Sequence, residues 1–209
     1  MPRTEPRPEM TASPRIAAIL LASGASKRMK GTDKLLEKID GMPLLRRSAL
    51  ACMPDVITCV LAVLPEGDRA RRAALDGLEV RILENPAPEA GIGHSLARAV
   101  TALPAGTEAA LVHLADMPDI RAEHVAALCS AFPPRAPRAI LRAASGTRPG
   151  HPVLFGRAHF PALSRLRGDR GARGLIAAQG AHLRLLPLPG RAALTDLDTP
   201  GDWAAYRAR

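Results

Sequence analysis

The chain has 209 residues, of which 47% are apolar, and a formal net charge of +9 that is carried mostly by arginine. That apolar fraction is enough to bury a core, but no run reaches the roughly 18 uninterrupted apolar residues of a membrane helix. A nucleic-acid surface would interleave clustered cations with stacking aromatics. Here aromatics are 2% of residues and the arginines are scattered, so we expect neither nucleic acid nor membrane as a partner. The net positive charge suits a protein that binds small anionic substrates, although biased codon usage would explain the many arginines equally well.

The first 15 residues are rich in Pro, Arg and Thr and contain no apolar stretch. We expect residues 1–15 to form a disordered leader, not a secretory signal, and the protein to be cytoplasmic. Cys52, Cys59 and Cys129 form no Cys-x-x-Cys pair and are odd in number. Each stands among apolar neighbours, which predicts reduced, buried cysteines.

Strands and helices alternate along residues 16–144. Strands are predicted at 16–22, 56–63, 80–83, 109–114 and 138–144, and helices at 43–52, 68–75, 95–103 and 121–132. This order predicts an α/β fold, a Rossmann-like three-layer sandwich with a mostly parallel sheet. Ligands bind such folds at the carboxyl ends of the strands, which directs attention to the loops 23–34, 85–95 and 115–119.

The pattern changes after residue 145. A loop is predicted at 146–150, strands at 153–155 and 183–188, and helices at 158–166, 172–179 and 200–206, with a Gly-rich bend at 168–171. We expect residues 16–209 to form a single domain with two halves, 16–144 and 145–209.

The loop after the first strand is rich in small and basic residues. Gly24 can adopt a positive φ and turn backbone N–H groups inward, which creates a concave anion site. Four cations, Lys27, Arg28, Lys30 and Lys34, follow within reach of a polyphosphate. A Walker motif is absent, and residues 91–96 only approach the dinucleotide fingerprint. The alternative is a solvated basic turn.

Two aspartates are candidate metal ligands. Asp116 follows an apolar strand at its carboxyl end, and Asp198 precedes the last predicted helix. Magnesium uses few carboxylates and completes its shell with water and phosphate oxygens. Alternatively, Asp116 begins a turn and Asp198 caps the helix. Asp119 and Asp196 are weaker candidates.

Two polar residues in the first half are candidates for nucleoside contacts. Asn85 can both donate and accept hydrogen bonds to a base or a ribose, and Ser95 can do the same or cap the helix that it begins. His151 lies in a Gly-His-Pro segment, and no histidine has metal-ligand spacing.

Leu21-Ala22-Ser23-Gly24-Ala25-Ser26-Lys27-Arg28-Met29, then Gly31, then Lys34-Leu35-Leu36, resembles the L-A-A-G-x-S-x-R-M-G-x-x-K-L-L signature of the molybdenum cofactor cytidylyltransferase (MocA-like) family of the MobA-like NTP transferases. Ser23 replaces an alanine, and Lys30 is one extra residue before Gly31. Further segments that match in order are 41–45, 85–86, 91–96, 116–118, 150–155, 168–173 and 196–200. The resemblance therefore runs from residue 16 to the end.

The resemblance implies a Mg²⁺-dependent nucleotidyltransferase that moves CMP from CTP to the phosphate of a molybdopterin-type cofactor and releases pyrophosphate. It implies catalytic roles for Arg28, Lys34 and Asp116, with Asp116 and Asp198 holding the metal. The nucleotide-binding residues would be Leu21, Ala22, Ser23, Gly24, Lys27, Arg28, Lys34, Asn85 and Ser95, all in the half 16–144. The acceptor-binding residues would be Arg148, His151, Pro152, Asp169 and Arg170, with Arg173 beside them, in the half 145–209. A molybdoenzyme or its chaperone is an expected partner.

Three alternatives stay open. The same chemistry on a sugar or polyol phosphate shares the first loop, although the Gly-His-Pro and 168–171 segments argue against it. A guanylyltransferase is a second alternative. The Leu-Ala-Ser-Gly form of the first loop argues against it, because that form is more similar to the cytidylyl branch. The third is a non-catalytic nucleotide sensor or cofactor chaperone, which would be expected to lose Asp116 or the basic loop.

Overall fold

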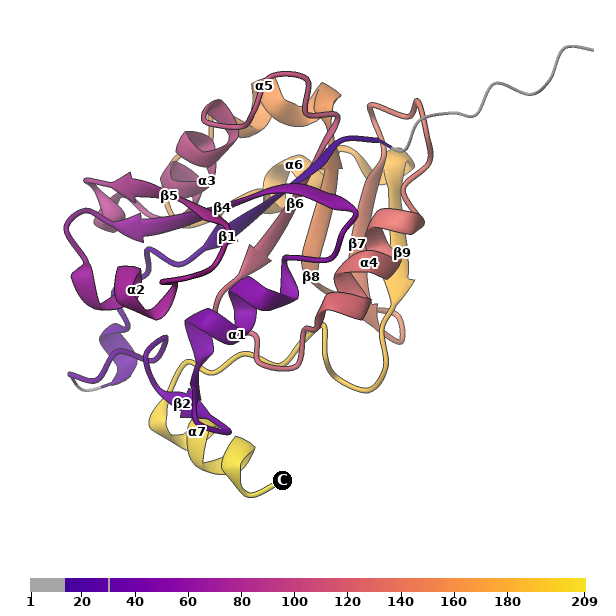
Figure 1. The fold of residues 1–209 in the computed structure, drawn as a ribbon. Coiled ribbons are helices and arrows are strands. Elements are labelled where there is room, and N and C mark those ends of the chain that lie inside the picture. Colours follow the sequence, from indigo (N-terminus) through magenta and orange to yellow (C-terminus); the bar gives the residue numbers. More distant parts are fainter. Residues whose placement is uncertain (1–13, 30) are drawn as a thin grey trace, which may run out of the picture.

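A computed structural model describes residues 14–29 and 31–209, and its centre is a seven-stranded sheet (Figure 1). The strands are β1 (Ile16–Leu21), β4 (Ile57–Pro65), β5 (Val80–Asn85), β6 (Ala109–Leu114), β7 (Ile140–Ser145), β8 (Arg148–Gly156) and β9 (Leu183–Pro187). Their spatial order is β5-β4-β1-β6-β8-β7-β9. Only β8 pairs antiparallel, with β6 and with β7. The predicted α/β fold with a mostly parallel sheet is confirmed.

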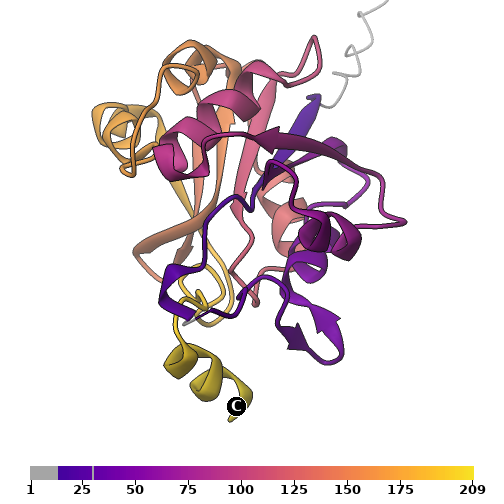
Figure 2. The ribbon, with the colours of Figure 1, turned by 90° about the vertical axis from the view of Figure 1, so that its left-hand side faces the viewer.

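Helices cover both faces of the sheet (Figure 2). The buried residues of α1 (Leu44–Ala51) and α4 (Ala122–Ser130) belong to one core, and those of α3 (Ile92–Thr101), α5 (Phe160–Leu163) and α6 (Arg173–Ala178) belong to the other. Along β1, Ile16, Ala18 and Leu20 face the first core, while Ile19 and Leu21 face the second. Burial on both faces explains why this strand is a continuous apolar run.

The remaining elements lie around the edges of the sandwich. They are α2 (Arg69–Ala74), α7 (Pro200–Arg207), the hairpin of β2 (Lys38–Ile39) and β3 (Met42–Pro43), and the 3₁₀ turns η1 (Lys27–Met29), η2 (Pro88–Ala90), η3 (Arg157–His159) and η4 (Gly180–His182). Arg207 of α7 forms an ion pair with Glu37, which attaches the last helix to the small hairpin. Figure 1 shows the two elements next to each other below the sheet.

Several predicted boundaries were wrong. The third long helix begins at Ile92, not at Ser95, because Gly91 is its N-cap at φ 93°. The predicted loop 146–150 is shorter, since Arg148–Gly156 is one strand. The predicted helix 158–166 is a 3₁₀ turn followed by the four-residue α5, and the β2–β3 hairpin was not predicted.

Hydrogen bonds of the Arg15 backbone fix the chain just before β1, although Arg15 is the last residue of the expected leader. Its backbone N–H donates to the Glu108 carboxylate over 2.9 Å, and its carbonyl accepts from the N–H groups of Glu108 and Ala109. Residues 1–13, to which most of the leader prediction applies, lie outside the described residues.

The cysteines are free thiols. Cys52 and Cys129 are buried as predicted, and burial raises the pKa of both thiols to about 12, while Cys59 is only half-buried. Within the described part of the chain, no helix combines the length and the apolar character needed to cross a bilayer.

The loop after β1 is fastened to α2 by the buried Arg71 guanidinium. Arg71 donates to Asp33 Oδ2 over 2.7 Å, to Asp33 Oδ1 over 3.0 Å, and to the carbonyls of Ala22 and Gly24. Burial alone would raise the pKa of Asp33, but Arg71, together with hydrogen bonds from Leu35 and Ser26, outweighs burial, so that the pKa lies below its ordinary value. Both ends of the loop are thus tied to one side chain that the sequence analysis did not single out.

We expect Arg71→Met to lower the free energy of unfolding by about 3–5 kcal/mol, because it leaves a carboxylate and two carbonyls without their partner. Arg72→Met on the same helix is the control, since the Arg72–Glu84 pair is half exposed and should contribute at most about 1 kcal/mol. Urea denaturation at neutral pH measures both. The difference should shrink in acid, because the Asp33 contribution is complete above its unfolded pKa of about 3.9 and is lost as the pH falls through the lower folded pKa. Equal losses in the two variants would contradict the anchoring role.

Candidate active site

A cleft of about 590 Å³ opens at the carboxyl edge of the sheet. Its walls come from the loop after β1, the η2–α3 segment, the end of β6 and the segment before α7. The lining residues include Leu21, Ala22, Ser23, Gly24, Arg28, Lys34, Glu89, Ser95, Asp116, Asp169 and Asp198. The three loops singled out by the strand-end rule therefore contribute to one cavity.

The backbone of the first loop differs from the expected one in one respect. Gly24 does not have a positive φ, whereas Ser26, at φ 49°, and Gly31, at φ 99°, do. The Ser26 hydroxyl donates to Asp33 Oδ1 over 3.1 Å, which supports this uncommon conformation. A Cβ placed on Gly24 would meet nothing within 4 Å, so the absent side chain leaves room in the cleft.

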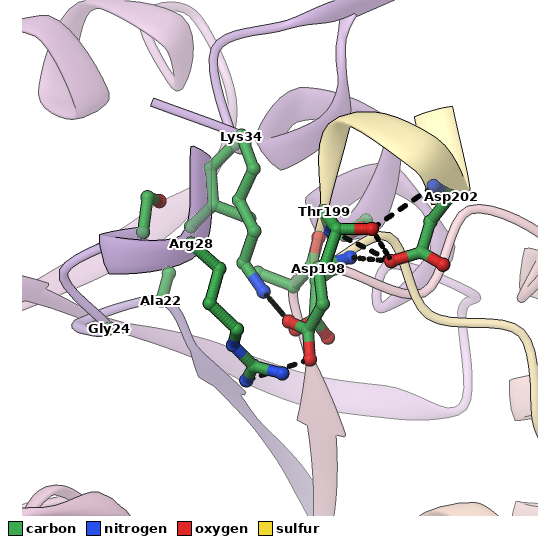
Figure 3. A network of polar contacts seen from close by, with 12 residues as sticks. Ala22, Gly24, Arg28, Lys34, Asp198, Thr199 and Asp202 are labelled. Carbon is green, nitrogen blue, oxygen red and sulfur yellow. Dashed lines mark hydrogen bonds and ion pairs between the residues drawn. The ribbon is translucent and has the colours of Figure 1, made fainter. Parts of the chain in front are cut away.

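The four charged residues that the sequence analysis selected for catalysis and metal binding form one cluster. Figure 3 shows Arg28 and Lys34 converging on Asp198. Lys34 Nζ lies 2.5 Å from Asp116 Oδ2 and 2.5 Å from Asp198 Oδ1. Arg28 Nη2 lies 2.9 Å from Asp198 Oδ2. Burial lowers the pKa of Lys34, but the two carboxylates outweigh it and the pKa is raised, so Lys34 stays an ammonium ion.

The two carboxylates are brought together by the backbone. The Leu197 N–H donates to the Asp116 carbonyl over 3.0 Å, which joins the segment before α7 to the end of β6. Thr199, not Asp198, caps α7, in a reciprocal box with Asp202. The Asp202 carboxylate also accepts from the Asp198 N–H over 3.2 Å. The capping alternative for Asp198 is therefore wrong, and its carboxylate instead contacts Lys34 and Arg28.

The two carboxylates are candidate ligands for a metal ion. Asp116 Oδ1 is buried without a hydrogen-bond partner in the described structure, while its Oδ2 faces Asp198 across Lys34. The described residues contain no group of three or more His, Cys, Asp or Glu suited to a metal, so any ion here would rely on two carboxylates, water and phosphate. The weaker candidate Asp119 accepts from Tyr206 and Arg209 instead, away from the pair.

A buried polar triad contributes two of its members, Ser23 and Ser95, to the cleft wall. Ser23 Oγ and Ser95 Oγ are 2.8 Å apart, and Asn85 Nδ2 donates to Ser95 Oγ over 3.0 Å. Asn85 is 0% exposed and does not line the cleft, while its Oδ1 accepts from the Ala87 N–H. The predicted nucleotide contact by Asn85 is thus replaced by a positioning role: it orients Ser95, which does line the cleft.

A second cavity of about 340 Å³ adjoins the first. The two share Leu21, Ile92, Leu114 and Asp169. The second has apolar walls from both halves of the chain and a rim of Arg142, His151, Arg170 and Arg173. Of the predicted acceptor residues, His151, Asp169 and Arg170 line it, as does Arg173. Arg148 is exposed and Pro152 buried, and neither is among the lining residues.

Arg142 is the residue of this cavity that sequence reasoning missed. It stands on β7, where Nε donates to the Gly150 carbonyl over 2.8 Å. Burial and the neighbouring Arg173 lower its pKa. Burial and Arg142 likewise lower the pKa of His151 to about 4, so the imidazole is neutral at physiological pH. The available signal was a single charge within the apolar run Ile-Leu-Arg-Ala-Ala.

The Gly91-x-Gly93 sequence serves packing, since the loop 167–169 lies directly against it. Gly93 N–H donates to the Gly168 carbonyl over 2.8 Å. A Cβ on Gly93 would lie 2.8 Å from that oxygen, and a Cβ on Gly91 would lie 2.4 Å from Asp169 Oδ1. The two glycines thereby hold Asp169 at the boundary between the cavities.

The model of the MobA-like NTP transferase domain matches residues 18–183, well over half of the chain. The chain belongs to this family. Family membership establishes the nucleotidyltransferase class and accounts for a cleft at the carboxyl edge of the sheet.

Curated relatives of this MobA-like domain carry several functional names. Purine catabolism protein PucB of Bacillus subtilis is 27% identical over 93% of this chain and 97% of its own. A molybdenum cofactor guanylyltransferase of Rhodobacter capsulatus is 31% identical over 90% of this chain and 87% of its own. A 2-C-methyl-D-erythritol 4-phosphate cytidylyltransferase of Deinococcus radiodurans is 32% identical over 95% and 90%. Guanylyl and cytidylyl transfer both occur among these names, so nucleotide and acceptor must be argued from the residues of this chain.

Among solved structures, Rv0371c of Mycobacterium tuberculosis superposes with a TM-score of 0.81 at 24% identity, covering 95% of this chain and all of that one. A structure of Rv0371c in complex with manganese gives a TM-score of 0.73 at 25% identity, covering 91% and 97%. The similarity confirms the fold of the MobA-like domain over nearly its whole length.

We expect Gly93→Ala to lower the free energy of unfolding by about 1–3 kcal/mol, because the added methyl group collides with the backbone of the loop 167–169. Gly174→Ala is the matched control: its Cβ would meet nothing within 4 Å, and alanine in a helix is favoured over glycine by about 0.5–1 kcal/mol. Urea denaturation should therefore separate the two variants in opposite directions. A Gly93 variant as stable as the parent protein would refute the close contact.

Proposed function

We propose that this MobA-like transferase moves CMP from CTP onto the phosphate of a molybdopterin-type cofactor and releases pyrophosphate, with Mg²⁺ as cofactor. The observation that carries the proposal is the position of the charged cluster. Lys34, Asp116 and Asp198 line the first cavity, and the second cavity adjoins it through four shared residues. One cavity for each substrate, with the charges of phosphoryl chemistry at one of them, suits a transfer between two bound molecules.

The first cavity suits the nucleoside triphosphate. Its volume is within the usual range of small-ligand sites. Leu21, Ala22, Ser23 and Gly24 supply backbone and small side chains for the nucleoside, and the Leu-Ala-Ser-Gly form favours cytosine. Arg28 and Lys34 supply cations for the phosphates. Two further cations that the sequence suggested, the side chain of Lys27 and residue Lys30, lie outside the described part of the structure. Catalysis is positioning and charge neutralisation, so no nucleophilic side chain is needed.

Asp116 and Asp198 would hold Mg²⁺, which when bound neutralises charge on the α-phosphate under attack. The buried, unpartnered Asp116 Oδ1 supports this assignment. So does the manganese complex of the related Rv0371c. The protein's own part is to fix both carboxylates from two distant segments through the Leu197–Asp116 backbone hydrogen bond.

The second cavity suits an acceptor with a flat ring and an anionic group. Val153, Phe155 and Ile176 contribute apolar walls. On the rim, Arg142 and Arg173 repel each other and make no ion pair with a carboxylate among residues 14–29 and 31–209. A phosphate placed near them would relieve that repulsion. The neutral His151 can donate or accept a hydrogen bond from the ring.

Two alternatives follow from the relatives. Similarity to the molybdenum cofactor guanylyltransferase of Rhodobacter capsulatus supports the alternative that this protein uses GTP in place of CTP on the same acceptor. Similarity to the cytidylyltransferase of Deinococcus radiodurans supports the alternative that the acceptor is a polyol phosphate. The apolar walls of the second cavity argue against that acceptor. We place the protein in the cytoplasm with a molybdoenzyme or its chaperone as recipient of the product.

The test is pyrophosphate release from purified protein given Mg²⁺, molybdenum-loaded molybdopterin and either CTP or GTP. We expect release with CTP, and a decrease of about 100-fold or more with Asp116→Asn, because one charge of the metal site is removed while its shape is kept. Release with GTP alone would replace the cytidylyl assignment with the guanylyl one. Protein that binds CTP but releases nothing would refute the acceptor.

Arg142→Gln should raise the KM for the acceptor at least about tenfold with little change in the KM for CTP, because a charged hydrogen bond to the acceptor is lost. Arg184→Gln on the neighbouring β9 is the control, since Arg184 is exposed and lines neither cavity. Steady-state kinetics with each substrate varied in turn separates the two KM values. A rise in the KM for CTP instead would place Arg142 at the nucleotide.

A further inference from the structure

The Lys34 ammonium stands where the two metal-binding carboxylates converge. Its Nζ contacts Asp116 Oδ2 and Asp198 Oδ1, each over 2.5 Å. Figure 3 shows the ammonium beside the Asp198 carboxylate. A metal ion held by both carboxylates would occupy the space between them, where the ammonium now lies. The ammonium and the metal ion would therefore compete for this position.

The segments that carry the two carboxylates are fixed by hydrogen bonds. Asp116 and Asp198 are joined by the Leu197 backbone, and the Thr199–Asp202 box fixes the start of α7 behind them. Lys34 reaches them through a flexible four-carbon stem. Its own backbone is anchored, since the neighbouring Asp33 is bound by Arg71 and the Leu35 N–H donates to Asp33 Oδ1 over 3.0 Å. Only the side chain of Lys34 needs to move for the exchange.

The exchange also balances charge. Two carboxylates now face one ammonium and one guanidinium, from Lys34 and Arg28. A metal ion entering between the carboxylates would make these two cations superfluous there. Both also line the nucleotide cleft, where the phosphates of a bound triphosphate would attract them.

We propose that Lys34 is an exchangeable counter-ion: it keeps the carboxylate pair closed to a metal ion until the phosphates of a nucleoside triphosphate draw its ammonium away. Metal and nucleotide then bind with positive coupling, and the free protein has little affinity for the metal alone. The proposal rests on the proposed nucleotidyl transfer for its nucleotide. The competition between Lys34 and the metal is a property of the protein by itself.

The test is a titration of the full chain with Mn²⁺ alone, with bound Mn²⁺ measured by electron paramagnetic resonance. We expect the parent protein to bind more weakly than about 1 mM and Lys34→Gln to bind at least about tenfold more tightly. Lys38→Gln is the matched control, because it removes the same charge from an exposed side chain of β2 and should behave like the parent. Asp198→Asn in the Lys34→Gln background should remove the gain, which locates it at the carboxylate pair.

Equal Mn²⁺ affinity in Lys34→Gln and Lys38→Gln, in variants shown by circular dichroism to be folded, would overturn the proposal. So would micromolar Mn²⁺ binding by the parent protein at the carboxylate pair, a measurement that needs no variant at position 34. Neither titration uses nucleotide, acceptor or turnover. If no pyrophosphate is released but Lys34→Gln still binds Mn²⁺ more tightly, the nucleotidyl transfer is refuted and the exchange stands. If pyrophosphate is released but Lys34→Gln binds Mn²⁺ no more tightly than Lys38→Gln, the exchange is refuted and the transfer stands.

Discussion

The parallel pairing of β1 with β6 is the constraint on which the site depends. Leu21 lies opposite Leu114 at the last position of both strands, so the two chains leave the sheet side by side. The basic loop and Asp116 therefore begin from adjacent points although they are far apart in sequence. The Leu197–Asp116 hydrogen bond then adds the segment with Asp198 to the same edge. Without this register, neither the cations nor the second carboxylate would meet Asp116.

Electrostatic balance explains how so many charges coexist at one edge. Three ion pairs near the cleft each join segments that are distant in sequence. They are Arg71 with Asp33, Lys34 with Asp116, and Arg28 with Asp198. The second cavity is different, because its lining residues Arg142 and Arg173 repel each other. The cluster of Arg28, Lys34, Asp116 and Asp198 thus balances its own charge, whereas three arginines outnumber two aspartates in the lining of the second cavity.

The sequence was sufficient for the sheet, for the three loops at its carboxyl edge and for the cluster of Arg28, Lys34, Asp116 and Asp198, because the motif and the strand pattern are local signals. It was not sufficient for Arg71 or Arg142. Their importance comes from burial and from partners brought close by the fold, which no spacing along the chain reveals. Burial also explains why the prediction for Asn85 differs from the structure. Its polarity predicted a ligand contact, yet Asn85 is completely buried and donates to Ser95. Likewise, Gly24 was expected to supply the left-handed turn, which Ser26 supplies through its bond to Asp33.

The reversed direction of β8 separates the two halves of the site in the chain. Because β8 runs against β6, its beginning lies at the carboxyl edge, and Gly150 and His151 reach the second cavity from the start of a strand. The β7–β8 hairpin and the loop before α6 can thus change in length or sequence while β1, β6 and their loops stay the same. A fold arranged in this way can retain one transfer chemistry while the molecule that receives the nucleotide is replaced by another during evolution.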